Sequence, residues 1–228
     1  MTAAGAGAAG PRVPPRLAAA AISLATLLVV VATSLVLLFN PAWVGFEQER
    51  ARADLWTGWT PAEVRQVTEA IVAEVYLGPG DFAQEIRGRP VLDERERGHM
   101  ADVRTVWLAF LLVAGLATAL LVVAWARSSD RGRFWRAVAA GAAVLAAGTV
   151  VVGVGFALLF DAAFELLHRL LFATGTYTFD PQTEHLVQLF PYAFWTETTV
   201  AIAALILVLA AGTWAAARWR VHRTEGAR

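Results

Sequence analysis

The chain has 228 residues, a formal net charge of zero and a hydrophobic content of 57%. It contains no cysteine, which excludes structural disulfides, thiolate metal sites and a cysteine nucleophile. Its 19 Lys or Arg positions are all arginine, and no basic surface rich in stacking aromatic residues accompanies them. We therefore expect no nucleic-acid partner.

Four uncharged stretches dominate the chain, and each is long enough for a helix to cross about 30 Å of hydrocarbon. The expected spans are about 17–39, 105–126, 137–160 and 196–217. We predict an all-α polytopic membrane protein with four transmembrane helices and a mostly helical extracytoplasmic cap, in one membrane domain over 17–228. The first span could instead be a cleaved signal peptide. Its apolar core is longer than usual and no A-x-A site follows, so we expect it to be retained.

The arginines outside the cap fall into three groups: Arg12 and Arg16; Arg127, Arg131, Arg133 and Arg136; Arg218, Arg220, Arg223 and Arg228. In a four-span topology all three groups lie on one side of the membrane, which the positive-inside rule makes cytoplasmic. Both termini are then cytoplasmic, and segments 40–104 and 161–195 face outward. Residues 1–16, rich in Ala, Gly and Pro, are expected to form a disordered cytoplasmic tail.

The first outward segment contains two helix starts. "TPAE" at 60–63 has the pattern of a capping box, followed by an apolar stripe at helical spacing. Asp93 and Glu96 repeat that pattern, which predicts a helix that starts near 94 and continues into the second span. On this helix Arg95, His99 and Asp102 share a sector of about 60°. Asp102 can therefore favour the protonated form of His99 or set its tautomer, although a histidine here could also be merely interfacial.

The second outward segment begins with a helix, expected over 161–172, that is apolar nearly all round. Its polar exceptions Asp161, Glu165 and His168 form one narrow stripe, with Arg169 at the margin. Ionisable groups at such a depth should face protein or a wet cavity, so they are candidate functional residues. A purely structural pairing of Glu165 with Arg169 is the alternative.

Beyond this helix, Gly175 and Pro181 interrupt the chain, and an apolar, aromatic-rich strip at 186–195 returns to the membrane. This strip is a candidate wall for the apolar part of a substrate, with Phe190 and Trp195 as substrate-binding residues. Glu197, at the mouth of the fourth span, is a further acid near the membrane.

Two histidines, His99 and His168, thus reach the outer membrane surface, and paired histidines suit general acid–base chemistry. Side chains that converge within about 4–7 Å would favour such cooperation, whereas a separation beyond about 12 Å would exclude it. We expect no metal and no cofactor, because the chain has no H-E-x-x-H motif and no two histidines at i, i+4. A serine hydrolase is poorly supported, since there is no G-x-S-x-G and all four serines lie in the first span or the inner loop. A scaffold protein whose histidines only pack or sense pH is the non-enzymatic alternative.

"HMADV" before the second span and "FELLHRLLF…TYTFDPQTEHLVQLFPYAFW" before the fourth resemble a family of small four-span bacterial membrane proteins. This family includes the lipoprotein intramolecular transacylase. The resemblance implies an acyltransferase of the bacterial cell membrane, whose partners are diacylglyceryl lipoproteins and membrane lipid. Acting on the outer face, it would move an acyl chain from the diacylglyceryl group to the α-amine of the N-terminal cysteine, without an acyl-enzyme. The two histidines of the family correspond to His99 and His168.

The chain departs from the family pattern around the second histidine. The family commonly has a phenylalanine just before this histidine and a Phe-Phe pair after it, whereas this chain has Leu167, Leu171 and Phe172 there. Tyr177 stands where a tryptophan is usual and is taken as a substrate-binding residue. Asp102, Asp161, Glu165, Arg169 and Glu197 are assigned supporting roles. Which histidine acts as base and which as acid stays open. An alternative function is that of a transferase or hydrolase acting on another outer-leaflet lipid.

Overall fold

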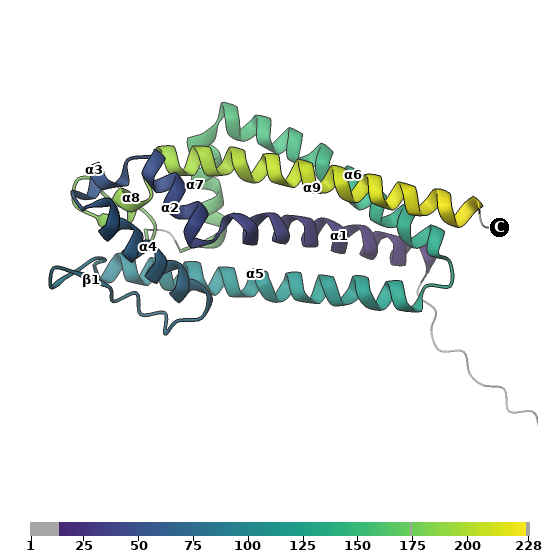
Figure 1. The fold of residues 1–228 in the computed structure, drawn as a ribbon, viewed down its shortest axis with the longest axis horizontal. Coiled ribbons are helices and arrows are strands. Elements are labelled where there is room, and N and C mark those ends of the chain that lie inside the picture. Colours follow the sequence, from purple (N-terminus) through teal and green to yellow (C-terminus); the bar gives the residue numbers. More distant parts are fainter. Residues whose placement is uncertain (1–13, 174, 227–228) are drawn as a thin grey trace, which may run out of the picture.

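The computed structural model describes residues 14–173 and 175–226, and these residues are mainly helical. Four long helices lie side by side, and the shorter elements gather at one end of them (Figure 1). The long helices are α1 (Pro15–Leu38), α5 (Glu94–Arg127), α6 (Arg131–Leu158) and α9 (Tyr192–Gly226). All four are long and apolar enough to cross a membrane. The predicted fold class, an all-α membrane protein with four spans, is confirmed.

The first helix is the centre of the bundle, because α1 packs against α5, α6 and α9, while α6 also packs along α9. The hydroxyl of Ser23 on α1 donates a hydrogen bond to the carbonyl of Ala137 on α6, at 2.8 Å. A side chain at Gly141 would collide with the backbone of Ser23, so this crossing requires glycine. Small residues of this kind allow membrane helices to approach closely.

Several helix ends differ from the predicted boundaries, and two of these differences have a direct physical explanation. α1 begins at Pro15, inside the expected tail, because proline suits the first turn of a helix; the expected tail at 1–13 lies outside the described residues. α6 ends at Leu158, two residues before the predicted end of the third span. Leu159 leaves the helical conformation, and α7 (Phe160–Leu171) follows in a new direction.

The cap contains α2 (Pro41–Arg50), α3 (Ala53–Thr57), α4 (Pro61–Tyr76), a hairpin of β1 (Glu85–Ile86) and β2 (Arg89–Pro90), and α8 (His185–Leu189). The predicted capping box of Thr60 and Glu63 begins α4 and is confirmed. The apolar stripe of α4 enters a core that includes Phe82, Leu92 and Leu189, all 2% exposed or less. The cap therefore has an apolar core of its own.

The helix α5 joins the cap to the bundle. With 34 residues it is about 51 Å long, more than the roughly 30 Å of a hydrocarbon layer, so residues 94–104 extend beyond the uncharged span at 105–126. The predicted capping box of Asp93 and Glu96 is confirmed. The buried carboxylate of Glu96 accepts hydrogen bonds from the backbone N–H groups of Asp93, at 2.7 Å, and of Leu186, at 2.6 Å. One side chain thus fixes the start of α5 and attaches α8 to it.

Replacing Glu96 by alanine is expected to destabilise the protein by about 2–4 kcal/mol, because two backbone N–H groups lose their acceptor and that of Leu186 is buried. Thermal unfolding of the detergent-solubilised protein, followed by tryptophan fluorescence, measures the effect. Glu94→Ala changes an exposed acid in the same first turn and is the matched control. Equal unfolding temperatures for the two variants would contradict this role of Glu96.

Candidate active site

His99 lies on the part of α5 that extends beyond the span, and only 7% of it is exposed. The rings of Phe172 and Phe179 pack edge-on against its imidazole, at centroid distances of 4.8 and 5.5 Å. Its Nδ1 atom is buried and has no hydrogen-bond partner among the described residues. A buried nitrogen without a partner is costly, so this imidazole is poised to hydrogen-bond a bound molecule.

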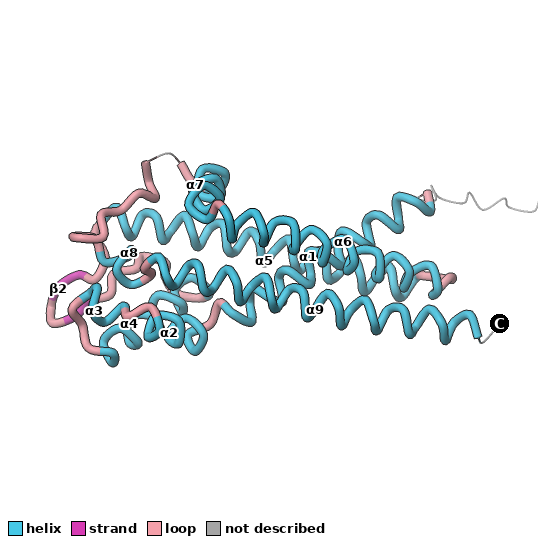
Figure 2. Tube along the Cα trace, turned by 90° about the horizontal axis from the view of Figure 1, so that it is seen from above, coloured by secondary structure: helices cyan, strands magenta, loops and turns pink. Residues whose placement is uncertain are grey.

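His168 comes from α7, which crosses the direction of the long helices and is seen almost end-on in Figure 2. The exposed leucines of this helix, such as Leu166 and Leu170, give it an apolar outer surface. Nδ1 of His168 lies 2.8 Å from the carbonyl oxygen of Phe164, which can only accept, so Nδ1 carries the proton of this hydrogen bond. In the neutral ring, Nε2 therefore presents a lone pair.

The two imidazole rings lie 6.2 Å apart between centroids and are nearly parallel, at 21°. This separation falls in the range that favours cooperation between two histidines. Phe172 contacts both rings, and Phe164 and Tyr177 pack on His168 at 4.2 and 5.2 Å. The pair of histidines is thus surrounded by aromatic side chains.

Burial lowers the pKa of His99 to about 4, and the neighbouring His168 lowers it as well, whereas the charge of Asp102 raises it. No hydrogen bond joins Asp102 to His99 in the described structure, so Asp102 acts on the imidazole through its charge alone. A pKa near 4 keeps His99 neutral at physiological pH.

The predicted acidic stripe of α7 divides into two parts. Glu165 forms an ion pair with Arg169 at 2.8 Å and accepts a hydrogen bond from the hydroxyl of Tyr177 at 3.2 Å. The guanidinium of Arg169 is the main reason that the pKa of Glu165 is lowered. The pairing considered as a structural alternative is therefore formed, and through Tyr177 it also contacts the His168 ring. Asp161 is exposed to the surroundings.

Arg95 connects the segment after α7 to α5. Its guanidinium donates to the carbonyl of Thr178 at 2.6 Å, pairs with Glu184 at 3.5 Å, and lies over the ring of Phe179. The helical spacing placed Arg95 beside His99 but did not reveal this role. By holding Phe179 in place, Arg95 closes one side of the His99 environment.

The aromatic strip at 186–195 is only partly available as a wall for acyl chains. Leu186 and Leu189 are buried in the cap core, so the first half of the strip is structural. Trp195 is 38% exposed and contacts Phe164 at 5.5 Å and Phe190 at 6.1 Å. Of the three predicted substrate-binding residues, Tyr177 contacts His168 directly and Trp195 contacts it through Phe164, whereas Phe190 packs against the cap core.

Glu197 does not join the histidines. It forms an ion pair with Arg50 of α2 at 2.8 Å, beside the buried Glu47. Phe164 and Phe179, conversely, line the site without having been predicted. Phe164 lies one helical turn before His168, which was the signal available for it, whereas Phe179 reaches His99 from a loop.

Within residues 14–173 and 175–226, no group of three or more His, Asp or Glu side chains gathers as metal ligands would. Aromatic side chains flank the two imidazoles: Phe172 packs against both rings and Tyr177 against His168. Such a site is equipped for proton transfer and hydrogen bonding to the polar group of a largely apolar ligand.

The fold and this site define an integral membrane protein with a histidine pair at the cap end of a four-helix bundle. The sequence profile of the family described as "Lipoprotein intramolecular transacylase Lit" matches residues 18–195. The chain belongs to this family, since the match covers more than half of it. None of the curated proteins compared with the chain matches it.

Solved structures with the same fold are those of the membrane integral lipoprotein intramolecular transacylase Lit from Bacillus cereus. One in meso structure is 19% identical, covers 92% of this chain and 97% of its own, and superposes with a TM-score of 0.76. Two others carry a substitution of one histidine, to arginine or to alanine, and superpose with TM-scores of 0.72 and 0.71 at 19% identity. They cover 94% and 92% of this chain and 95% of their own. At this identity the likeness shows a common fold.

His99 is expected to titrate with a midpoint near pH 4. The unfolded chain takes up this proton near pH 6.5, so the contribution of His99 to stability declines as the pH falls from about 6.5 to 4. Nitrogen-15 NMR of histidine-labelled protein in micelles measures the midpoint, and the signal that disappears in His99→Ala assigns it. His168→Ala should raise the midpoint and Asp102→Asn should lower it further. A midpoint near 6.5 in the unsubstituted protein would contradict the buried, neutral state.

Proposed function

We propose that this chain is an intramolecular lipoprotein transacylase, which moves an acyl chain from the diacylglyceryl group to the α-amine of the N-terminal cysteine. The observation that carries the proposal is the stacked pair of His99 and His168, 6.2 Å apart in an aromatic environment at the cap end of the bundle. Family membership supports it. The arginine distribution supports cytoplasmic termini and a site on the outer face of the membrane.

His168 is the general base in this proposal. Its Nδ1–H is committed to the carbonyl of Phe164, so Nε2 is the nitrogen that can accept a proton from the substrate amine. A fixed tautomer and a fixed ring orientation are what a backbone carbonyl provides to such an imidazole.

His99 stabilises the oxyanion. It stays neutral because burial disfavours its charged form, and a neutral imidazole carries one N–H that can donate to the developing negative charge. In a water-poor site such a hydrogen bond is stronger than in water, because the local dielectric is low.

The proton and bond changes balance without any covalent enzyme intermediate. The neutral α-amine attacks the ester carbonyl carbon, a C–N bond forms, and the carbonyl oxygen becomes an oxyanion facing His99. The amine nitrogen then loses a proton to Nε2 of His168. When the C–O bond to the glyceryl group breaks, His168 returns that proton to the glyceryl oxygen, which leaves as a hydroxyl. Holding donor and acceptor in one molecule supplies much of the rate enhancement.

Several other residues around the pair have supporting roles in this proposal. Tyr177 packs on His168 while its hydroxyl bonds Glu165, and Arg169 holds Glu165 in turn. Trp195 and Phe164 offer an apolar surface to the acyl chain. Asp102 adjusts the charge preference of His99.

The test is mass spectrometry of the N-terminal peptide of a lipoprotein co-expressed with this protein, in a host without N-acylating enzymes of its own. The unsubstituted protein should produce a lyso-form peptide, isobaric with the diacylglyceryl form but acylated on nitrogen. His99→Ala and His168→Ala should each lower the yield by about 10²–10⁴-fold, the usual contribution of acid–base groups.

His222→Ala is the matched control, because His222 is exposed near the far end of α9 and should leave the yield unchanged. A diacylglyceryl peptide left unmodified by well-expressed protein would overturn the proposal in favour of another outer-leaflet lipid or of a scaffold role. Full yield from either histidine variant would overturn the roles given to the pair.

A further inference from the structure

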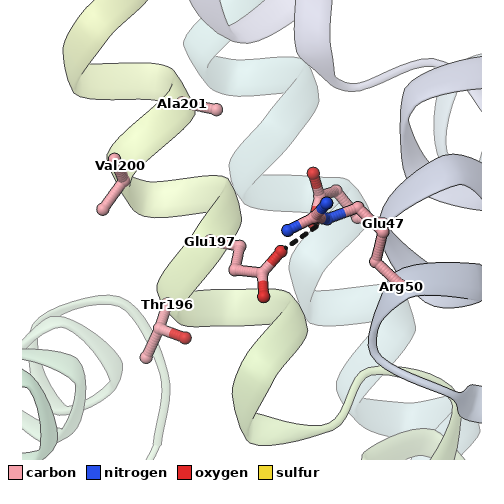
Figure 3. Close-up of a pocket in the computed structure, with 6 residues that line it drawn as sticks. All are labelled: Glu47, Arg50, Thr196, Glu197, Val200 and Ala201. Atoms are coloured by element: carbon pink, nitrogen blue, oxygen red, sulfur yellow. Dashed lines mark hydrogen bonds and ion pairs between the residues drawn. The ribbon is translucent and has the colours of Figure 1, made fainter.

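A second polar site lies between α2 and the first turns of α9 (Figure 3). It is an open pocket of about 410 Å³, lined by Glu47, Arg50, Thr196, Glu197, Val200 and Ala201. Trp195 points from α9 toward α7, whereas Glu197, two residues further and about 200° around the helix, points toward α2. The pocket is thus separate from the histidine pair, and Figure 2 shows α2 and α7 on opposite sides of the outer end of α9.

Glu47 is the unusual residue of this pocket. It is 3% exposed, and its Oε2 atom is buried without a hydrogen-bond partner among the described residues. The carboxyl group of Glu197 is the nearest acidic neighbour that acts on the Glu47 carboxyl group. Burial raises the pKa of Glu47, and the neighbouring Glu197 raises it further. Two adjacent carboxyl groups repel each other when both are ionised, and a shared proton or a neighbouring cation relieves this repulsion.

Arg50 neutralises the two acids only in part. Its Nε donates to Oε2 of Glu197 at 2.8 Å and lies 3.8 Å from Oε2 of Glu47. Its terminal nitrogens make no hydrogen bond within the described part of the chain, and the side chain is 53% exposed. The pocket therefore combines an excess of negative charge with unused N–H donors beside it.

The other wall of the pocket is apolar. Val200, 67% exposed, and Ala201 lie in the uncharged run of α9, so this wall continues toward the hydrocarbon layer. Charged groups at one end and a lipid-facing helix at the other are the two parts that an amphiphilic ligand with a dipolar headgroup would need.

We propose that this pocket binds the phosphoethanolamine headgroup of a membrane phospholipid. The primary ammonium donates to Oε2 of Glu47 and to Glu197, and the phosphate accepts from the terminal nitrogens of Arg50. An acyl chain follows Val200 and Ala201. The proposal commits to a primary ammonium, because three N–H donors satisfy the unpartnered carboxylate oxygen, whereas a quaternary ammonium has none. It does not rest on transacylase activity.

The test is native mass spectrometry of the full chain in detergent micelles, with phosphatidylethanolamine and phosphatidylcholine of identical acyl chains added at equal concentration. The unsubstituted protein should retain the ethanolamine lipid about five- to tenfold better, a difference typical of one lost charge-assisted hydrogen bond. Glu47→Gln and Glu197→Gln should each abolish this preference, and Arg50→Gln should weaken the binding of both lipids. Glu225→Gln is the matched control, because Glu225 pairs with Arg136 near the opposite end of the same helix.

Equal retention of the two lipids by the unsubstituted protein would overturn the proposal and leave a shared proton between Glu47 and Glu197 as the explanation of the cluster. A preference that survives in both glutamate variants would do the same. If Glu47→Gln does not fold, Glu197→Gln, whose side chain is 39% exposed, decides alone. Displacement of the ethanolamine lipid by a diacylglyceryl-cysteinyl peptide would assign the pocket to the substrate and overturn the lipid assignment.

Discussion

The two hydrogen bonds accepted by the buried carboxylate of Glu96 are the interaction on which the site depends. One fixes the first turn of α5, and this sets which side of the helix carries His99, so that its side chain points into the junction of cap and bundle. The other attaches α8, and with it the segment that leads back to the fourth span. Arg95, one residue earlier, holds the loop that carries Phe179 against His99. The environment of His99 is therefore fixed by groups one turn away on the same helix.

The bilayer supplies the second constraint. α6 ends at Leu158, and α7 turns across the bundle (Figure 2), where its exposed leucines can face lipid while His168 faces α5. A helix with one apolar surface and one ionisable stripe is stable at a membrane boundary, since each face meets its preferred surroundings. The break at Leu159 is thus what brings a residue 69 positions after His99 in the chain to a ring separation of 6.2 Å.

Much of this arrangement was predictable. Long uncharged runs predict membrane-spanning helices, and capping boxes predict helix starts. A polar stripe on an apolar helix predicts a surface that faces protein. The partners of Glu197 were not predictable, because Arg50 and Glu47 come from a helix nearly 150 residues earlier, and helical periodicity contains no information about such contacts. Phe179 was missed for the same reason: a loop residue has no period, and its position depends on Arg95.

Burial at the cap end of the bundle acts in the same way on groups of opposite charge. It lowers the pKa of His99 and raises the pKa of Glu47, so both side chains are shifted toward their uncharged forms. An amine that enters the surroundings of His99 is subject to the same cost of burying a charge, which favours its neutral, nucleophilic form over the ammonium. The environment that keeps His99 unprotonated would therefore also help to keep the amine unprotonated for attack. The burial of His99 thus favours the neutral form of both the imidazole and the amine in the proposed reaction.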